Sequence, residues 1–360
     1  MNGKNKEKIE EFLKDKKAEL FEKISDKTIK CLACKHYCQI LEGKTGICGV
    51  RANFDNELFL LVKNRPSAIA IDPIEKKPLY HFKPGTRVYS IGTLGCNFRC
   101  LWCQNWQLSQ TVKEFSGFDA EKALAFVLTN SEELKPEEAV NEALATNSQG
   151  IAYTYNEPTI FVEYAKEIAA LAKEKGLFNV FVSSGYESDE TLKYLNGLID
   201  AFNVDLKAYG NKTYLKYTGA MYDKILDTIE KLYKKGVWLE ITTLVIPKVN
   251  DDEESLKNIA SFIASLDVNI PWHITRFHPD YKMLNVPPTP IETLLKAKKI
   301  GEKEGLNFIY IGNVPNKEFN STYCPNCGNL VIEREFFLVK NYLENGRCPY
   351  CGFKIPGVWG

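Results

Sequence analysis

The chain has 360 residues, and its 46 Lys and Arg residues balance its 46 Asp and Glu residues, so the formal net charge is zero. This balance points to no nucleic-acid-binding tract and no membrane surface, although it leaves room for a local basic patch. No apolar run approaches the length that crosses a membrane, and the N-terminus lacks the hydrophobic core of a signal peptide. The composition predicts a cytoplasmic protein with no membrane partner, built from one large domain and small attachments.

The N-terminal segment opens with an expected helix. Its first 24 residues have the apolar spacing of an amphipathic helix. The predicted buried face consists of Ile9, Phe12, Leu13, Leu20 and Phe21. This helix is the first part of segment 1–86, which also holds four cysteines.

The 11 cysteines are the most informative residues of the sequence. A cytoplasmic chain disfavours disulfides, and 11 is an odd number. The cysteines fall into three groups with none left over: Cys31, Cys34, Cys38 and Cys48; Cys96, Cys100 and Cys103; and Cys324, Cys327, Cys348 and Cys351. Thiols buried only for packing would leave single cysteines scattered through strands, so the grouping favours metal ligation.

The first group has the spacing C-x2-C-x3-C-x9-C within CLACKHYCQILEGKTGIC. Four thiolates at this spacing fit either one zinc ion or an auxiliary 4Fe–4S cluster, and the sequence does not choose between them. Four buried free thiols fit poorly because CKHYCQ is hydrophilic. His36 stands between two of these cysteines, where we expect it to be exposed.

From residue 87 onward, short runs rich in β-branched and aromatic residues alternate with segments of helical period. The expected strands are VYSIGT from Val88, IAYTY from Ile151, NVFVS from Asn179, FNVDL from Phe202, VWLEITTLVI from Val237, WHITRF from Trp272 and NFIYIG from Asn307. The expected helices cover 119–146 with a break near Pro136, 158–175, 188–198, 221–235, 251–265 and 290–304.

Alternation of strand and helix predicts an α/β fold with a parallel sheet covered by helices. Seven strands without an eighth favour a partial (β/α)6-type, TIM-like barrel over a closed eightfold one. Chemistry is then expected at the C-terminal ends of the strands. Segment 1–86 precedes this barrel, which covers 87–317, and segment 318–360 follows it.

The second cysteine group directly follows the first predicted strand, in GCNFRCLWCQNW. Three thiolates of a C-x3-C-x2-C loop leave one iron of a 4Fe–4S cluster without a protein ligand, just as a catalytic zinc keeps an open position. Trp102 would shield such a cluster from water. The competing interpretation is a zinc site that a distant residue completes.

The third group, CPNCG and CPYCG with 20 residues between Cys327 and Cys348, is typical of a zinc ribbon. Two hairpin turns supply two thiolates each, giving a closed tetrahedral site for a structural zinc ion. Such a ribbon either contacts RNA or protein or only stabilises the fold.

The loop C-x3-C-x-aromatic-C after the first strand of a partial barrel resembles the radical S-adenosylmethionine (SAM) superfamily. The resemblance implies that Cys96, Cys100 and Cys103 hold the catalytic cluster, whose open iron binds the methionine end of SAM. One electron from a donor such as ferredoxin or flavodoxin would then yield a 5′-deoxyadenosyl radical.

Residues after the later strands resemble those of pyruvate formate-lyase activating enzymes. Glu157, in YTYNEP, corresponds to the glutamate that helps to hold the methionine amine, although Tyr155 and Asn156 replace two glycines. By the same resemblance, the SSGY and NVDLKAY segments and the TTLVIPKVND turn place these residues near the cofactor: Ser183, Asp205, Lys207 and Asn250. Lys248 replaces a glycine in that turn, where Asn250 and Asp251 would alternatively cap the next helix.

The order of further segments, among them IDPIEKKPLYHFKPGT and PWHITRFHPDY, resembles the radical enzymes named AmmeMemoRadiSam. That resemblance implies two partner protein families and leaves the target open as a protein, an RNA or a small molecule. We expect side chains after the sixth strand to reach the barrel mouth: His273, Arg276, His278, Asp280 and Lys282. Asn105, Trp106 and Gln110 either close over the substrate or pack the loop. The alternative function is a non-catalytic iron–sulfur or zinc module for electron transfer or binding.

Overall fold

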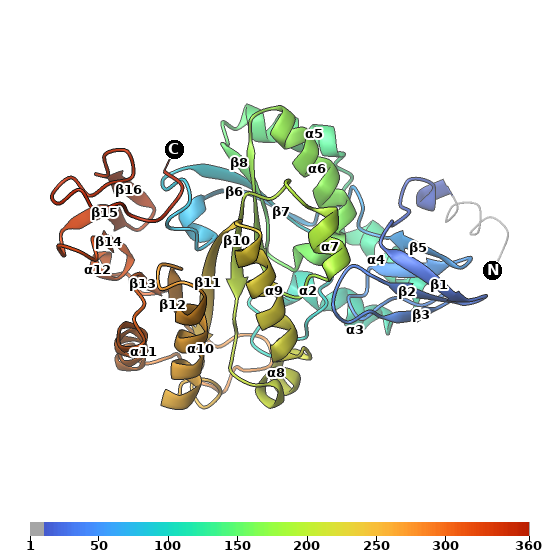
Figure 1. Ribbon diagram of the computed structural model, residues 1–360. Coiled ribbons are helices and arrows are strands. Elements are labelled where there is room, and N and C mark those ends of the chain that lie inside the picture. The colour runs from blue at the N-terminus through green and yellow to red at the C-terminus, as the bar shows by residue number, and fades with distance from the viewer. Residues whose placement is uncertain (1–10, 360) are drawn as a thin grey trace.

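A computed structural model describes residues 11–359 and centres on one eight-stranded sheet covered by helices (Figure 1). Its strand order is β13-β12-β11-β10-β9-β8-β7-β6. Seven neighbouring strands run parallel, and β6 pairs antiparallel to β7. Their bounds are β6 Ala68–Pro73, β7 Arg87–Gly92, β8 Gly150–Tyr153, β9 Phe178–Ser183, β10 Ala201–Asp205, β11 Trp238–Val245, β12 Trp272–Arg276 and β13 Ile309–Gly312.

The sequence prediction of an α/β fold with an open parallel sheet is confirmed. All seven predicted strands are present as β7 to β13, and in residues 11–359 the edge strands β6 and β13 do not pair with each other. The predicted break near Pro136 is real because Pro136 begins a new helix. The helices that correspond to the predicted ones are α4 Ala120–Asn130, α5 Pro136–Ala145, α6 Val162–Glu174, α7 Asp189–Tyr194, α9 Tyr222–Lys234, α10 Glu253–Leu266 and α11 Ile291–Lys303.

Short helices that the sequence analysis did not predict surround the cysteine loop and β10. They are α2 Trp106–Ser109, α3 Thr111–Ser116 and α8 Asn211–Thr218. The 3-10 turn η1 Ile74–Lys76 and the helix α12 Lys317–Asn320 were also not predicted, whereas the 3-10 turn η2 Pro158–Phe161 begins the predicted helix 158–175. The helices α2 and α3 follow the cysteine loop directly and pack beside α4. Their shortness explains why no helical period marked them.

The N-terminal segment is mainly β-structure, so the helix predicted over the first 24 residues is wrong in its second half. Residues 11–13 are helical, but Phe21 begins a strand and pairs with Cys31 across a hairpin. The turn of this hairpin is short, and cross-strand pairing outweighs the helical spacing. Ile9 lies outside the described residues. The strands are β1 Phe21–Ser25, β2 Thr28–Cys31, β3 Gln39–Leu41, β4 Arg51–Phe54 and β5 Glu57–Leu60.

The segment between β6 and β7 closes the end of the barrel at which the parallel strands begin. Glu240 of β11 accepts hydrogen bonds from the backbone amides of Tyr80 (2.9 Å) and His81 (2.7 Å) of this segment. Glu240 also lies 2.6 Å from Nε2 of His273 in β12. Because these residues lie near the N-terminal ends of their strands, the interior remains open only toward the C-terminal ends.

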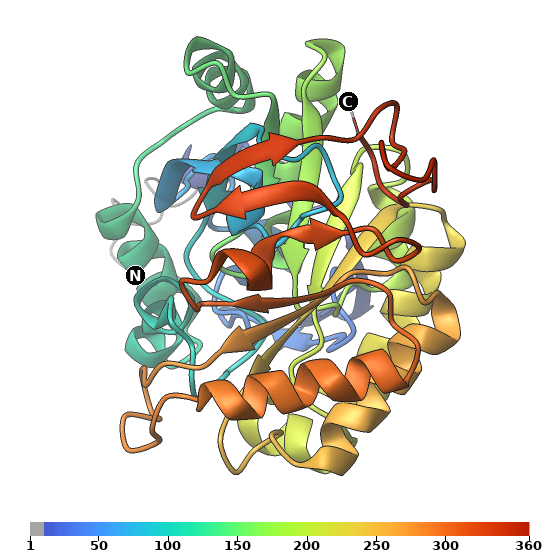
Figure 2. The same ribbon diagram turned by 90° about the vertical axis from the view of Figure 1, so that its left-hand side faces the viewer.

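The C-terminal segment packs against the last strands, on the opposite side of the sheet from the N-terminal strands (Figures 1 and 2). Its strands are β14 Thr322–Tyr323, β15 Leu330–Glu335 and β16 Leu338–Asn341. Fully buried Arg334 donates a hydrogen bond to the carbonyl oxygen of Tyr80 (2.5 Å), and His81 Nε2 lies 2.6 Å from the Tyr310 hydroxyl. The C-terminal segment therefore covers the same end of the barrel, at which the parallel strands begin.

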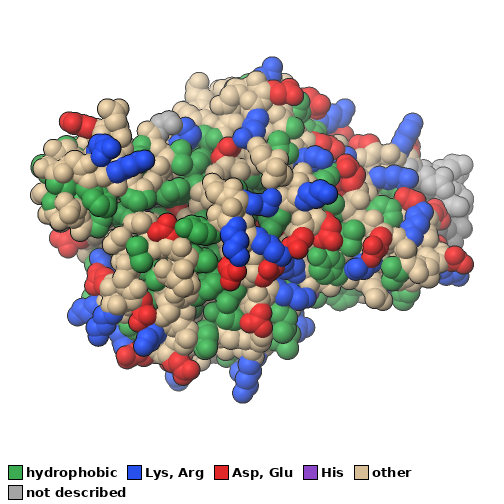
Figure 3. Space-filling view, in the orientation of Figure 1, with side chains coloured by type: hydrophobic (Ala, Val, Ile, Leu, Met, Phe, Trp, Pro, Cys, Tyr) green, Lys and Arg blue, Asp and Glu red, His purple; other side chains and the backbone are tan. Residues whose placement is uncertain are grey.

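In Figure 3, positive and negative side chains are interspersed over the visible face. None of the helices within residues 11–359 has both the length and the apolar character needed to cross a bilayer.

A buried ion pair joins the N-terminal segment to the barrel. Arg51 of β4 and Glu163 of α6 are 2% and 1% exposed, and Arg51 donates bonds of 2.7 and 2.6 Å to the two carboxylate oxygens. The same carboxylate accepts hydrogen bonds from the backbone amides of Glu19 and Leu20. Burial alone would raise the pKa of Glu163, but the Arg51 guanidinium lowers it.

Arg51→Met should lower the free energy of unfolding by about 3–5 kcal/mol because it leaves the Glu163 carboxylate buried without its partner. Lys234→Met is the matched control, since it removes an exposed ion pair with Glu230 and should cost about 0–1 kcal/mol. Thermal unfolding followed by circular dichroism measures both. Equal midpoints for the two variants would contradict a structural role of the buried pair.

Candidate active site

The barrel interior opens into a cavity of about 520 Å³ at the C-terminal ends of the strands. Its walls come from the cysteine loop after β7 and from the ends of β8, β9, β10, β11 and β12. Of the nine residues predicted to hold the cluster or the cofactor, eight line this cavity, and only Asn250 does not: Cys96, Cys100, Trp102, Cys103, Glu157, Ser183, Asp205 and Lys207. The structure thus brings together side chains that lie more than 100 residues apart in sequence.

Backbone hydrogen bonds on both sides hold the cysteine loop in place. The amides of Arg99 and Leu101 donate to carbonyl oxygens at the end of α8, at 2.8 and 3.1 Å. From the other side, buried Lys113 of α3 donates through Nζ to the carbonyl oxygens of Cys96 (3.0 Å) and Phe98 (2.7 Å). The loop conformation is therefore fixed by its neighbours.

The three thiols fit a cluster with one open iron. Cys96 and Cys100 are buried, Cys103 is half-buried, and all three line the cavity. The Phe98 amide donates to the Cys96 sulfur at 3.3 Å, and the Ser109 hydroxyl lies 3.1 Å from the Cys103 sulfur, which suits thiolate ligands. The three sulfurs do not lie within 4.8 Å of one another, whereas thiolates on one zinc ion would be about 3.8 Å apart.

Trp102 forms part of the wall beside these sulfurs. It is 4% exposed, and its ring lies 6.0 Å from that of Tyr217 between centroids. This position agrees with the predicted shielding of the cysteine loop from water.

Glu157 presents a carboxylate to the cavity that is held on several sides. One oxygen accepts hydrogen bonds from the amide and hydroxyl of Thr159 and from Ser183 (2.9 Å), and the other accepts from the Ser184 amide (2.8 Å). The side chain is 1% exposed. A carboxylate oriented by this many donors is suited to bind a cation in the cavity.

The Ser183 hydroxyl lies between two carboxyl groups but carries only one hydrogen. It contacts Glu157 at 2.9 Å and the fully buried Glu187 at 2.5 Å. Both contacts are satisfied when protonated Glu187 donates to Ser183 and Ser183 donates to Glu157. In agreement, burial raises the pKa of Glu187, and the neighbouring Glu157 charge raises it further. Glu187 therefore helps to orient Glu157 through the Ser183 hydroxyl, a role that sequence reasoning missed.

Asp205 and Lys207 form an ion pair of 2.6 Å at the end of β10. Burial would lower the pKa of Lys207, but Asp205 and the nearby Cys100 thiolate raise it, so this lysine stays charged. The pair places one positive and one negative group beside the cysteine loop. Both line the cavity, as the Asp-x-Lys spacing predicted.

Asn250 is fully buried and lies behind this pair. Its Nδ2 donates to the carbonyl oxygens of Lys207 (2.7 Å) and Leu244 (2.8 Å), so it ties two strand ends together. It does not cap α10, because Asp252 accepts the capping hydrogen bond. Lys248 has φ of 64°, a conformation that favours glycine, so the turn keeps the glycine-type backbone despite the substitution.

Residues from outside the barrel strands also reach the cavity. Lys77, from the segment before β7, lines the wall, makes a 2.6 Å ion pair with Asp72 and lies 4.6 Å from the centre of the Tyr155 ring. Burial lowers the pKa of Lys77 to about 8. Tyr155 has φ of 70° at one of the replaced glycine positions, and Asn156 donates to the carbonyl oxygen of Gly95 at 2.8 Å. Among these residues, the sequence indicated a place near the cofactor only for Tyr155 and Asn156, because they stand where the resembling enzymes have two glycines.

The residues predicted after the sixth strand divide between several places. His273 lies at the opposite end of the barrel, bonded to Glu240, so its predicted position at the mouth is wrong. Arg276 donates to the carbonyl oxygen of Thr289, and Lys282 contacts Glu114 of α3. His278 is exposed and lies 3.6 Å from Asp280. None of these five predicted side chains lines the cavity, whereas Thr275 and Asn313 do.

The segment after the cysteines contributes lining residues and a packing contact. Asn105 lines the cavity and donates to the carbonyl oxygen of Tyr155 at 2.8 Å, and Gln110 also lines it. The Trp106 ring stacks on Tyr281, with centroids 5.5 Å apart. The segments after β7 and β12 therefore contact each other beyond the C-terminal ends of these strands.

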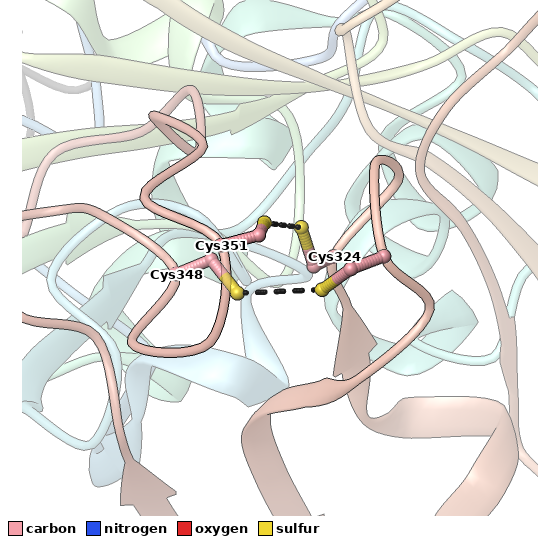
Figure 4. Close-up of side chains that lie close together, drawn as sticks. Cys324, Cys348 and Cys351 are labelled. Atoms are coloured by element: carbon pink, nitrogen blue, oxygen red, sulfur yellow. Dashed lines mark hydrogen bonds between the residues drawn. The ribbon is translucent and has the colours of Figure 1, made fainter.

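The C-terminal cysteines form a compact cluster far along the chain from the cavity (Figure 4). The four sulfurs lie within 4.8 Å of one another, and two pairs are 3.6 Å apart: Cys324 with Cys351 and Cys327 with Cys348. Cys324 and Cys348 are buried, and the other two are exposed. This arrangement fits four ligands of one metal ion.

Comparison with known proteins gives a family for the part of the chain that builds the cavity. Residues 90–259 match the model of the Radical SAM superfamily. An uncharacterized protein of Methanocaldococcus jannaschii is 42% identical over 348 residues, which make up 95% of this chain and 99% of that protein. The pyruvate formate-lyase-activating enzyme of Staphylococcus aureus is 26% identical over 212 residues, 54% of this chain and 76% of the enzyme.

Among solved structures, SuiB of Streptococcus suis bound to S-adenosylmethionine matches with 10% identity and a TM-score of 0.46. The match covers 67% of this chain and 53% of SuiB.

Glu187→Gln should increase stability relative to the wild type as the pH rises. The folded-state pKa of Glu187 lies above its unfolded value, so the wild type loses stability as pH rises from about 4.3 through the folded pKa. Glutamine does not titrate, so the difference in Tm, variant minus wild type, should grow between about pH 5 and pH 8. The exposed Glu174→Gln variant is the control, and a pH-independent difference for Glu187→Gln would contradict a protonated Glu187.

Proposed function

Because the chain belongs to the Radical SAM superfamily, and to the same family as the M. jannaschii protein, we propose that it starts a radical reaction with S-adenosylmethionine on a second molecule. The single observation that carries the proposal is the shared cavity. Three cysteines, the Glu157 carboxylate and the Asp205–Lys207 pair face the same space of about 520 Å³. An electron-transfer or metal-binding module would need the cysteines but not the charged residues opposite them.

In this proposal Cys96, Cys100 and Cys103 hold a 4Fe–4S cluster. The bound cluster supplies one electron that breaks a carbon–sulfur bond of S-adenosylmethionine, and the resulting radical removes a hydrogen atom from the substrate. Trp102 keeps water from the sulfurs, and the hydrogen bonds from Phe98 and Ser109 stabilise the thiolates.

The charged residues of the cavity would bind the two ends of the methionine part and the sulfonium. Glu157 accepts hydrogen bonds from the ammonium group, while Ser183 and protonated Glu187 keep this carboxylate oriented. Asp205 is the negative group nearest to the expected sulfonium, and Lys207 holds it at 2.6 Å. Asn250 acts through the Lys207 backbone as a positioning residue.

Two finer assignments belong to the same proposal. We assign the chain to the AmmeMemoRadiSam group, which implies partner proteins from the two other families of that system. The supporting residues are those of the segment before β7, which closes the barrel and brings Lys77 to the cavity. The electron donor is a protein of the ferredoxin or flavodoxin class.

We propose that the four C-terminal cysteines hold a structural zinc ion. Their sulfur spacing of 3.6 Å within each pair supports this choice, because four thiolates at about 2.3 Å from zinc lie about 3.8 Å apart. The site packs against the closed end of the barrel and stabilises it.

Anaerobic protein reconstituted with iron and sulfide and reduced with dithionite should convert S-adenosylmethionine to 5′-deoxyadenosine and methionine. The rate is expected to be slow without substrate. Liquid chromatography with mass spectrometry measures both products. If protein with a full cluster forms neither product, the proposal is contradicted. The Cys100→Ala variant serves as the inactive control.

Glu157→Gln should weaken the binding of S-adenosylmethionine by about 1–3 kcal/mol, because it removes a charge-assisted hydrogen bond to the ammonium group. Cluster content should stay the same. Equilibrium dialysis with the reconstituted protein measures the affinity, and exposed Glu174→Gln is the matched control. An unchanged affinity would reduce Glu157 to a structural role at the start of η2.

A further inference from the structure

The four N-terminal cysteines lie next to the cysteine loop of the cavity, although 48 residues separate Cys48 from Cys96 in sequence. Cys31, Cys34 and Cys48 are buried, Cys38 is half-buried, and all four are free thiols. The three buried cysteines belong to the same hydrophobic core as the cysteine loop. His36, which we expected to be exposed, is half-buried, with its ring 4.7 Å from that of Tyr186.

A direct backbone contact joins the two groups. The Cys96 amide donates a hydrogen bond of 3.3 Å to the carbonyl oxygen of Cys48. This approach requires glycine at position 95: φ is 88°, and a Cβ atom there would lie 2.5 Å from that same carbonyl oxygen. A ligand residue of one group is thus separated from a ligand residue of the other by one hydrogen bond.

Two side chains also stand between the groups. The Asn97 amide carries its oxygen 3.8 Å from the Cys96 sulfur and approaches Cys34 on the other side. Lys113 Nζ holds the cysteine loop, and its side chain packs so closely on Gly49 that a Cβ there would lie 2.8 Å away. Within residues 11–359, buried Nδ2 of Asn97 and Nε2 of His36 have no hydrogen-bond partner, which leaves both available to the sulfides of a cluster.

The spacing of the sulfurs distinguishes this group from the C-terminal one. Among residues 11–359, the only three or more Cys, His, Asp or Glu ligand atoms within 4.8 Å of one another are those of the C-terminal cysteines. The N-terminal sulfurs are spread more widely, as are those of the cysteine loop. Thiolates around four irons are farther apart than thiolates around one zinc ion, so sulfurs that are not gathered within 4.8 Å fit a cluster better than a single zinc ion.

We propose that Cys31, Cys34, Cys38 and Cys48 hold a second 4Fe–4S cluster that passes single electrons to the cluster of the cavity. The proposal rests on the proposed function for its acceptor. A ferredoxin or flavodoxin loses one electron, the N-terminal cluster goes from the 2+ to the 1+ state and returns to 2+ as the electron moves on, and the cavity cluster is reduced by one. No bond forms and no proton moves. Cys38, the least buried ligand, is the side at which the donor approaches.

The first test uses the triple variant Cys96→Ala, Cys100→Ala and Cys103→Ala, reconstituted anaerobically with ferrous iron and sulfide. We expect about 4 irons and about 1 zinc per chain. After reduction with dithionite, the paramagnetic resonance signal of a 4Fe–4S cluster should appear and should not change when S-adenosylmethionine is added. Neither readout depends on cleavage of S-adenosylmethionine, so the result stands even where the proposed function fails.

Two outcomes of this test would overturn the proposal. Iron near zero together with about 2 zinc ions per chain would identify the N-terminal site as a zinc site. Absence of both extra iron and extra zinc would leave no metal site there. The Cys324→Ser variant is the matched control, because it should lose zinc and keep all its iron.

The second test separates electron transfer from a structural role. The double variant Cys31→Ser and Cys38→Ser keeps the cavity cysteines, and its remaining cluster should still change its resonance signal on addition of S-adenosylmethionine. It should lose most 5′-deoxyadenosine formation with reduced flavodoxin and retain it with dithionite, which reaches the cavity cluster directly. The relay would be contradicted if the variant formed 5′-deoxyadenosine at the same rate relative to the wild type with flavodoxin as with dithionite. Where this variant does not fold, the triple variant still decides the metal.

Discussion

The parallel direction of seven strands is the constraint on which this molecule depends. Each strand of β7 to β13 ends at the same edge of the sheet, so the residue that follows each strand meets the others there. Glu157, Asp205 and the cysteine loop lie far apart in sequence but face one cavity for this reason. The opposite edge is closed by the segment before β7 and by the C-terminal cysteine segment, which confines chemistry to a single mouth.

Within this frame, the charges of the cavity are arranged by residues that do not themselves reach it. Glu187 contacts the Ser183 hydroxyl, which donates to Glu157, and Asn250 fixes the backbone of Lys207. Gly95 allows the N-terminal cysteines to touch the cysteine loop, because any larger residue would collide with the Cys48 carbonyl oxygen. In the proposed reaction, cofactor binding and electron supply would depend on buried contacts around the cavity as much as on its lining.

The sequence predicted the barrel well because its strands and helices carry clear periods, and it predicted the lining residues that directly follow strands. It failed where pairing is non-local: Phe21 lies in a hairpin strand although its neighbours have helical spacing. Lys77 was missed because it comes from a segment before the first parallel strand, and His273 was misplaced because it lies at the start of β12 rather than its end. The supporting roles of Glu187 and Asn97 follow only from three-dimensional contacts.

The most direct test of the central claim is an anaerobic crystal structure of the reconstituted protein with S-adenosylmethionine. The account predicts one cluster on Cys96, Cys100 and Cys103, with the methionine end of S-adenosylmethionine in the cavity and its ammonium group bonded to Glu157. It also predicts the sulfonium on the side of Asp205. A metal on these cysteines that has a fourth protein ligand, or S-adenosylmethionine bound outside the cavity, would contradict it.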